Sequence, residues 1–132
     1  MTTGAERNVA AAEAYYHAMN ANDLAGVASH LHPDVQFVSP MVNVAGKEAV
    51  LEAVKRFRSR LNSIRVHTKF GSELQAILIY DVDFGEPIGI SRTAALITFE
   101  DNLISCIELF YDARPFEKNL KQNASRRASA EG

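Results

Sequence analysis

The chain has few of the features that would place it outside the ordinary globular proteins. Its 132 residues include one cysteine, Cys106, so an internal disulfide and a CxxC zinc arrangement are both excluded. The formal charge is only −2, so no positive excess favours binding to nucleic acid or to anionic membranes. No window approaches the roughly 20 apolar residues that span a bilayer, and the N-terminus lacks a basic region followed by an apolar run. We therefore expect a cytoplasmic protein in a reducing compartment, without nucleic-acid or membrane partners.

The size and composition fit one domain. With 47% hydrophobic residues, the chain is long enough to bury a core of its own. The last residues, EKNLKQNASRRASAEG, are polar or small, which is typical of an unstructured tail. We predict a flexible N-terminus over residues 1–7, a folded domain over residues 8–116 and a disordered tail over residues 117–132.

In the first half of the chain, apolar residues recur at the spacings of three and four that mark one face of a helix. Three helices are predicted on this ground, over residues 8–20, 24–31 and 47–61. Asn22 or Asp23 can cap the second helix, because these side chains accept hydrogen bonds from free backbone N–H groups. This helix ends before Pro33, and a short strand is predicted over residues 35–39.

The second half alternates apolar and polar residues with the period of two that strands show. Four strands are predicted, over residues 64–70, 74–84, 88–99 and 103–111. The connections contain turn-forming residues at hairpin spacing: Gly71-Ser72, Gly85-Glu86-Pro87 and Asp101-Asn102. Helices followed by a mostly antiparallel run of strands indicate an α+β fold.

Two of the predicted strands are apolar on both faces. Ile77 and Ile79 lie opposite in phase to Leu78 and Val82. The last strand repeats this pattern, with one group on each face: Ile104, Cys106 and Phe110 against Leu103, Ile107 and Leu109. Helices can cover one face of such a sheet, and an apolar face left in water usually marks an interface. The pattern predicts a homodimer formed through the outer face of the sheet.

The segment HLHPDVQFVSP concentrates side chains that could bind a metal. His30 lies in the last turn of the second predicted helix, and His32 and Asp34 flank Pro33 outside it. Their side chains need not converge, whereas dedicated sites bring ligands onto one face, as HExxH does. Histidine at a helix C-terminus is also a common stabilising choice. We therefore predict no metal site.

The order helix, helix, strand, helix and long meander, with NANDLAGVASHLHPDVQFVSP near the start and ISCIELFYDARPF near the end, resembles the NTF2-like superfamily. Within it, the chain looks most like the SnoaL-like group of ketosteroid isomerases and polyketide cyclases, over about residues 8–116. The resemblance implies a cone, in which N-terminal helices pack in a curved, mostly antiparallel sheet around an apolar cavity. It also implies a small hydrophobic ligand and a homodimer. It leaves the reaction open, because this scaffold hosts several kinds of enzyme as well as non-catalytic binders.

The isomerases of this group remove a proton with a carboxylate and hold the resulting enolate with hydrogen-bond donors. The resemblance aligns Tyr15 with the donor tyrosine, Ser39 with the catalytic aspartate and Ala95 roughly with the second donor acid. Two of the three groups are therefore replaced. Ser39 can donate a hydrogen bond but cannot act unaided as a base. Tyr15 is equally consistent with a core aromatic residue whose hydroxyl is satisfied.

Glu108 is the best remaining candidate for a base, because the resemblance places its row inside the cavity. A carboxyl group among apolar neighbours is expected to have a raised pKa, which suits acid/base work. A one-residue bulge would instead turn Glu108 outward. Other residues of inward phase are expected to contact the ligand: Phe37, Tyr80, Ser91, Thr93, Cys106 and Phe110.

Two functions of different classes are consistent with these residues. The first is an isomerase, lyase, cyclase or hydrolase acting on a small apolar molecule, with Glu108 as acid/base and Tyr15 and Ser39 as donors. The second is a non-catalytic module for dimerisation or ligand carriage, which an outward Glu108 or a collapsed cavity would favour. An epoxide hydrolase of this superfamily would need an Asp–Arg–Asp array, and Arg92 points outward in the predicted phase. Neither function calls for a cofactor.

Overall fold

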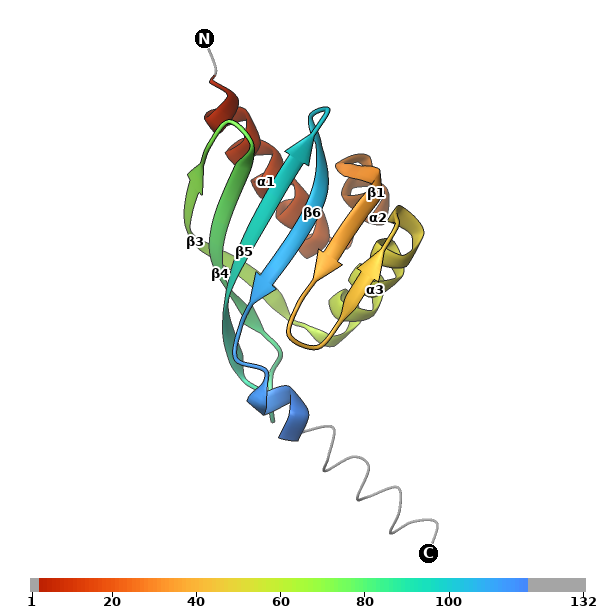
Figure 1. Cartoon of the computed structure of the whole chain (residues 1–132). Coiled ribbons are helices and arrows are strands. Elements are labelled where there is room, and N and C mark those ends of the chain that lie inside the picture. Colours follow the sequence, from red (N-terminus) through yellow and green to blue (C-terminus); the bar gives the residue numbers. More distant parts are fainter. Residues whose placement is uncertain (1–2, 119–132) are drawn as a thin grey trace, which may run out of the picture.

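The computed structural model of the chain describes residues 3–118 (Figure 1). Helices and strands follow one another in this order: α1 (Gly4–Asn20), α2 (Leu24–Ser29), β1 (Leu31–Val38), β2 (Asn43–Ala45), α3 (Lys47–Arg60), β3 (Ser63–Gly71), β4 (Gln75–Asp83), β5 (Ile90–Glu100) and β6 (Leu103–Phe110). Among these residues, none of the helices has the length and apolar character needed to cross a membrane.

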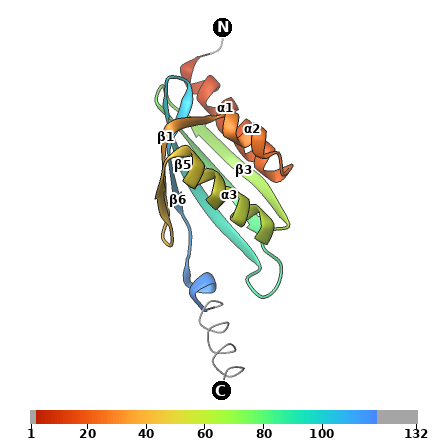
Figure 2. The same cartoon turned by 90° about the vertical axis from the view of Figure 1, so that its right-hand side faces the viewer.

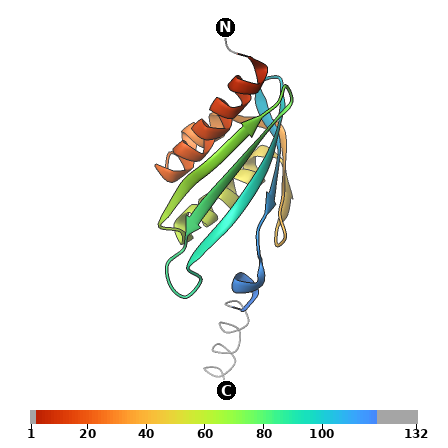
Figure 3. The ribbon, with the colours of Figure 1, turned by 90° about the vertical axis from the view of Figure 1, so that its left-hand side faces the viewer.

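The strands form one sheet in the order β2-β1-β6-β5-β4-β3. β1 pairs with β6 in parallel, and every other neighbouring pair is antiparallel. The helices lie against one face of the sheet, which we call the inner face, and the opposite side is the outer face (Figures 2 and 3). This architecture confirms the predicted α+β fold class.

The first helix begins at Gly4, earlier than its apolar pattern predicts. The Thr3 hydroxyl accepts a hydrogen bond from the backbone N–H of Glu6 at 3.1 Å. Thr-x-x-Glu is the signature of a capping box, in which this bond satisfies one of the free N–H groups of the first turn. Helix α1 therefore includes residues 4–7, although the apolar pattern predicts them to be flexible. Most of the tail predicted over residues 117–132 lies outside the described residues, from 119 onward.

The second helix starts where the sequence predicts, but the strand after it is longer. The Asp23 carboxylate caps α2 by accepting from the N–H of Gly26 at 3.0 Å. β1 then begins at Leu31 and runs through Pro33. A proline cannot donate to a strand ladder, and the pairing with β6 is indeed interrupted between Leu31 and Gln36. The three-residue strand β2, which no pattern predicts, pairs with the end of β1.

The two faces of the sheet differ in what covers them. The inner face packs on α1 and α3, and it carries most of the core. The fully buried large aliphatic residues of its strands are Leu31, Val35, Leu78, Val82, Ile97, Ile104 and Ile107. The outer face is also apolar, with Phe70, Ile77 and Leu96 as direct cross-strand neighbours. Phe70 is 64% exposed and Phe110 is 52% exposed. The prediction that the central strands are apolar on both faces is confirmed.

Candidate functional site

Three tyrosines meet between α1 and the inner face of the sheet, and we call Tyr15, Tyr16 and Tyr80 the tyrosine cluster. The ring centroids of Tyr15 and Tyr16 are 5.0 Å apart, and those of Tyr16 and Tyr80 are 4.7 Å apart. The hydroxyls of Tyr16 and Tyr80 share a hydrogen bond of 3.2 Å. Thr93 lies beside Tyr80 on β5, and Tyr111 follows the end of β6. Helix α1, strands β4 and β5 and the residue after β6 thus bring hydroxyl-bearing side chains into an otherwise apolar interior.

Burial keeps these phenols protonated. Desolvation raises the pKa of Tyr15 and Tyr16 well above the ordinary tyrosine value, because the interior disfavours the phenolate. Desolvation also raises the pKa of Tyr80, although its hydrogen bond with Tyr16 opposes part of this effect. At neutral pH the cluster therefore offers hydrogen-bond donors and no negative charge. Among residues 3–118, the buried side-chain atom without a hydrogen-bond partner is Nε of Arg58, so the hydroxyls of the cluster are not unsatisfied buried donors.

The interior holds no acidic side chain among the described residues. The buried polar residues of this part of the chain are Asn8 and Thr93. Asn8 donates to the backbone carbonyls of Ser72 and Glu73, so it ties α1 to the β3–β4 turn. The tyrosine cluster can therefore orient a ligand through hydrogen bonds, but no described carboxylate is placed to remove a proton from it.

The prediction that Glu108 faces the interior is wrong, and a β-bulge is the physical reason. Phe99 pairs with Ile104, whereas the preceding residue of β5, Thr98, pairs with Cys106, so Ser105 is an extra residue in β6. Such a bulge reverses the alternation beyond it. Ile107 consequently points inward and is fully buried, whereas Glu108 points outward beside Leu96.

The same bulge moves two predicted ligand contacts to the outer face. Cys106 and Phe110 share the outer side of β6 with Glu108, so the prediction that they line the interior is also wrong. The pKa of the Cys106 thiol is raised by partial burial and by the nearby charge of Glu108, which makes it a poor nucleophile at neutral pH. The other predicted lining residues lie on the inner face: Phe37, Tyr80, Ser91 and Thr93.

Ser39 has a structural task in the turn between β1 and β2. Its hydroxyl donates to the carbonyl of Val42 and accepts from the N–H of Val42, both at 3.0 Å. Its own N–H bonds to the same carbonyl at 2.9 Å. Because both hydrogen-bonding functions of the hydroxyl serve this turn, the structure does not present Ser39 as a free donor for a ligand.

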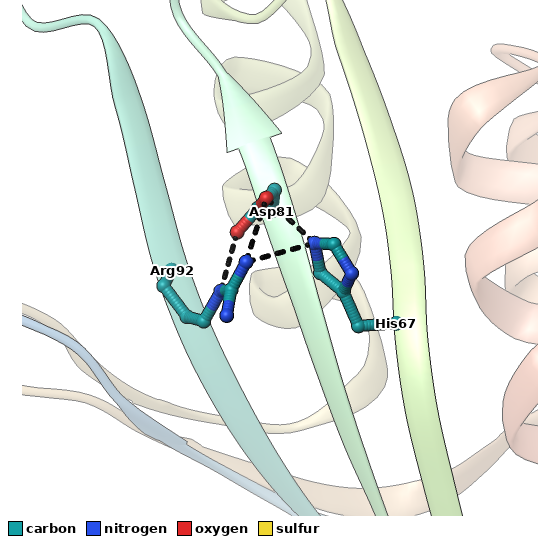
Figure 4. A network of polar contacts seen from close by, with 3 residues as sticks. All are labelled: His67, Asp81 and Arg92. Atoms are coloured by element: carbon teal, nitrogen blue, oxygen red, sulfur yellow. Dashed lines mark hydrogen bonds and ion pairs between the residues drawn. The ribbon is translucent and has the colours of Figure 1, made fainter.

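A polar network spans the outer face across β3, β4 and β5 (Figure 4). Arg92 donates from Nε and Nη2 to the two oxygens of Asp81, at 2.8 and 3.2 Å. His67 Nε2 lies 2.6 Å from Asp81 Oδ2 and 3.0 Å from Arg92 Nη2, and the tautomer of His67 decides which of these contacts is a hydrogen bond. The bonds from Arg92, and then that from His67, hold the pKa of Asp81 far below its usual value. A register shift between Val66 and Thr68 turns His67 toward this network.

The orientation of Arg92 bears on epoxide-hydrolase chemistry. Arg92 points outward, as its phase predicts, and its side chain is 63% exposed. Its carboxylate partner, Asp81, lies on the same outer face. The described residues therefore do not form an Asp–Arg–Asp array in the interior.

One group of side chains has the composition of a metal site, but its hydrogen bonds argue against one. Potential ligand atoms of His32, Glu100 and Asp101 lie within 4.8 Å of one another at the start of β1 and the β5–β6 turn. His32 Nδ1 accepts from the N–H of Asp34 at 3.0 Å. A neutral imidazole that accepts at Nδ1 carries its proton on Nε2, so no lone pair is left for a metal. Glu100 and Asp101 are exposed carboxylates that water can solvate.

A hollow lies outside the interior, at the beginning of α3. It has a volume of about 680 Å³ and is wide open to solvent. Its lining comes from β1, β2 and the first turn of α3: Pro33, Ala45, Gly46, Lys47, Glu48, Ala49 and Leu51. No hydrogen-bond network or group with a displaced pKa marks this hollow among the described residues.

Sequence reasoning missed two members of the interior, Tyr16 and Tyr111. The helical pattern assigns Tyr16 only to the apolar stripe of α1, and its bond to Tyr80 joins residues 64 positions apart. Tyr111 faces the interior only because of the bulge in β6. The signal available in the sequence was the pair Tyr15-Tyr16 itself, since two adjacent tyrosines on a buried helix need partners for their hydroxyls.

Comparisons with known proteins identify the family of the chain and agree with its fold. The family model described as "SnoaL-like domain" matches residues 12–107. No curated protein matches the chain significantly. A solved structure from Kribbella flavida is 25% identical, with a TM-score of 0.78, over 94% of this chain and 97% of that one.

Two solved structures that share the fold have enzymatic descriptions. A steroid delta-isomerase from Pseudomonas aeruginosa is 22% identical, with a TM-score of 0.72, over 95% of this chain and 93% of that one. An LEH-like epoxide hydrolase from M. tuberculosis is 14% identical, with a TM-score of 0.73, over 96% and 98%. At these identities the likeness shows a common NTF2-like fold, which hosts both ketosteroid isomerases and epoxide hydrolases.

Proposed function

The chain belongs to the SnoaL-like domain family, and from this premise we propose that it binds a neutral, mostly apolar small molecule between its helices and the inner face of the sheet. One observation carries the proposal: the tyrosine cluster places phenol hydroxyls inside an apolar interior. Phenol hydroxyls in an apolar interior can donate to a ligand oxygen.

Binding without proton abstraction is the function that these groups support best. The interior of the described chain holds protonated phenols and no carboxylate. The isomerases of this fold need a carboxylate base, and Glu108, the candidate for that role, points outward. The observations therefore favour a ligand carrier over an isomerase, lyase or cyclase with Glu108 as acid/base.

The first test is a thermal-shift screen with neutral steroids, polyketide-like aromatic compounds and terpenoids. A ligand present at about 100 times its dissociation constant adds roughly 2.7 kcal/mol to the free energy of unfolding. For a domain of this size, that gain raises the melting temperature by roughly 10 °C.

Tyr15→Phe provides the decisive variant, because it removes a hydroxyl of the tyrosine cluster and keeps the ring. We expect an unchanged melting temperature without ligand and an affinity about fivefold weaker, as one hydrogen bond contributes about 1 kcal/mol. Thr68→Val is the control, since it removes a hydroxyl from the outer face. The proposal is wrong if no compound stabilises the parent protein, or if Tyr15→Phe and Thr68→Val respond to every ligand as the parent does.

We further propose that two copies of the chain associate through the outer face. The exposed neighbours Phe70 and Ile77 form an apolar row with Leu96, and both signs of charge accompany it, in Arg92 and Glu108. A surface with an apolar centre and both charges can pair with itself about a twofold axis. Light scattering should give the dimer mass at micromolar concentration and the monomer mass for Ile77→Lys. A monomeric parent protein would rule this interface out.

A further inference from the structure

The polar network of the outer face joins its side chains through a single carboxylate. Figure 4 shows Arg92 and His67 reaching Asp81 from the strands on its two sides. Arg92 donates to both oxygens of Asp81, and His67 Nε2 lies 2.6 Å from one of these oxygens and 3.0 Å from Arg92 Nη2. A protonated imidazole has a hydrogen on both nitrogens, so it donates to Asp81 beside a second cation. The network then holds two positive charges and one negative charge.

The other charged side chains around His67 balance one another. They are two cations on β3 and two carboxylates on α1 and β4: Arg65 and Lys69, Glu13 and Asp83. Lys69 donates to Glu13 at 2.8 Å. Arg65 lies directly across from Asp81, and Asp83 follows two residues later on β4. The excess of one positive charge therefore remains when His67 is protonated.

Glu108 is the complementary group on the same face. Its carboxylate forms no ion pair among residues 3–118. Its cross-strand neighbours are the apolar residues Leu96 on β5 and Val38 on β1, and its side chain is half-buried in a single copy of the chain. Burying it further without a cation would cost free energy. The outer face thus carries a carboxylate that lacks a cation and a network that lacks a carboxylate.

The register of the sheet places these two groups on opposite sides of one apolar row. Glu108 pairs with Leu96, which lies four residues beyond Arg92 on β5. Midway between them is a row of direct cross-strand neighbours: Ile79, Ala94 and Phe110. A twofold axis that runs along this row lets the row face its own copy. Glu108 of each copy then lies over Arg92 of the other copy.

We propose that two copies of the chain pair through Glu108 of one and the Asp81–Arg92–His67 network of the other, so that protonation of His67 tightens the dimer. This inference rests on the interface proposed above, because it adds a register and a regulation to the same surface. A guanidinium carries five N–H groups, so Arg92 can hold a second carboxylate beside Asp81.

The sign of the pH effect follows from the charges. At pH 8 a neutral His67 leaves the network with one charge of each sign. On acidification to pH 6, histidine becomes positive whereas carboxylates stay ionised, so each contact gains an attraction. An ion pair of this exposure changes affinity about threefold, and the two symmetric contacts of a dimer together should change it about tenfold.

Sedimentation equilibrium of the full chain at pH 6, 7 and 8 tests the pH effect. The dimer dissociation constant of the parent should fall about tenfold from pH 8 to pH 6. His67→Gln and Glu108→Gln should both lose this dependence, because each removes one side of the contact. His17→Gln is the matched control, since it removes an exposed histidine of α1, and it should keep the tenfold change.

Cross-linking tests the register. Arg92→Cys and Glu108→Cys are prepared as separate proteins in a Cys106→Ala background, and a short bismaleimide reagent is added to each protein and to their mixture. We expect a covalent dimer in the mixture and little in either protein alone, because each of the two positions faces the other. The mixed dimer also keeps one intact contact between Glu108 and Arg92.

Several results would overturn this contact: no pH effect in the parent, an effect that survives in Glu108→Gln or His67→Gln, its loss in His17→Gln, or equal cross-linking in the separate proteins. If the parent is then still a dimer and Ile77→Lys is a monomer, the proposed interface stands without this register and regulation. A parent protein that is monomeric at every pH refutes both proposals.

Discussion

Because of the bulge in β6, alanine substitutions at two neighbouring residues, Ile107 and Glu108, should differ strongly in their effect on the free energy of unfolding. Ile107 is fully buried on the inner face, whereas Glu108 lies on the outer face beside Leu96. Replacing a buried isoleucine with alanine removes apolar surface from the core and leaves a cavity, at a cost of 2 to 5 kcal/mol as a general range. Since Ile107 has no exposed surface, we expect Ile107→Ala to cost about 3 to 4 kcal/mol.

Glu108→Ala is the control for Ile107→Ala, because it makes the same replacement at the next residue of β6. Glu108 has no ion-pair partner among residues 3–118, so its removal should change the free energy of unfolding by less than about 0.5 kcal/mol. Urea unfolding followed by circular dichroism gives both values. Measurements at several protein concentrations separate folding from the proposed dimerisation.

The reverse ranking would refute the placement of the two residues. If β6 had no bulge, Glu108 would point inward and Ile107 outward, as the strict alternation of the sequence predicts. Glu108→Ala would then have a large effect on stability, because a buried charged group would be replaced, and Ile107→Ala would have a small one. Equal costs would also contradict the structure.

Two further predictions concern the polar groups on either face of the sheet. The folded-state pKa of Asp81 is depressed, so its ion pairs stabilise the protein at pH values above its unfolded-state pKa of about 4, and this stabilisation is lost as the pH falls below that pKa. The urea midpoint of the parent should therefore drop between pH 7 and pH 2.5 by more than that of Asp81→Asn. Equal drops would show that the network does not hold in solution. Tyr80→Phe leaves the buried hydroxyl of Tyr16 without its partner, so it should lower the free energy of unfolding by about 1 to 2 kcal/mol, whereas adding Tyr16→Phe should recover most of this loss. A double-mutant cycle from chemical denaturation measures the coupling between the two residues. Additive costs would contradict the hydrogen bond.

Much of the fold follows from local patterns in the chain. The spacing of apolar residues locates all three helices, and alternation locates the strands β3 to β6 with errors of a few residues at their ends. Asp23, one of the two predicted candidates, caps α2. These features depend on neighbours within about four residues, so composition and spacing carry them. Strand β2 has three residues and exists through its pairing with β1, which explains why no pattern predicts it.

The site was only partly predictable, because side chains on a strand change face when one residue is added. Tyr80 on β4 and Thr93 on β5 pair without a register shift, and their phase indicated the inner face correctly. Glu108, Cys106 and Phe110 follow the extra residue Ser105, and alternation placed all three on the wrong side.

By itself, the sequence determined an α+β domain with helices before a meander, a sheet apolar on both faces and an interior tyrosine on the first helix, since each rests on periodicity within one segment. Only the tertiary structure decided that the Tyr16 hydroxyl meets that of Tyr80, that Phe116 reaches Phe84 and Tyr111, and that Glu108 faces outward. The physical reason is that these contacts depend on strand register and on how separate elements pack. A single bulge or a turn after the last strand changes both without altering any local pattern.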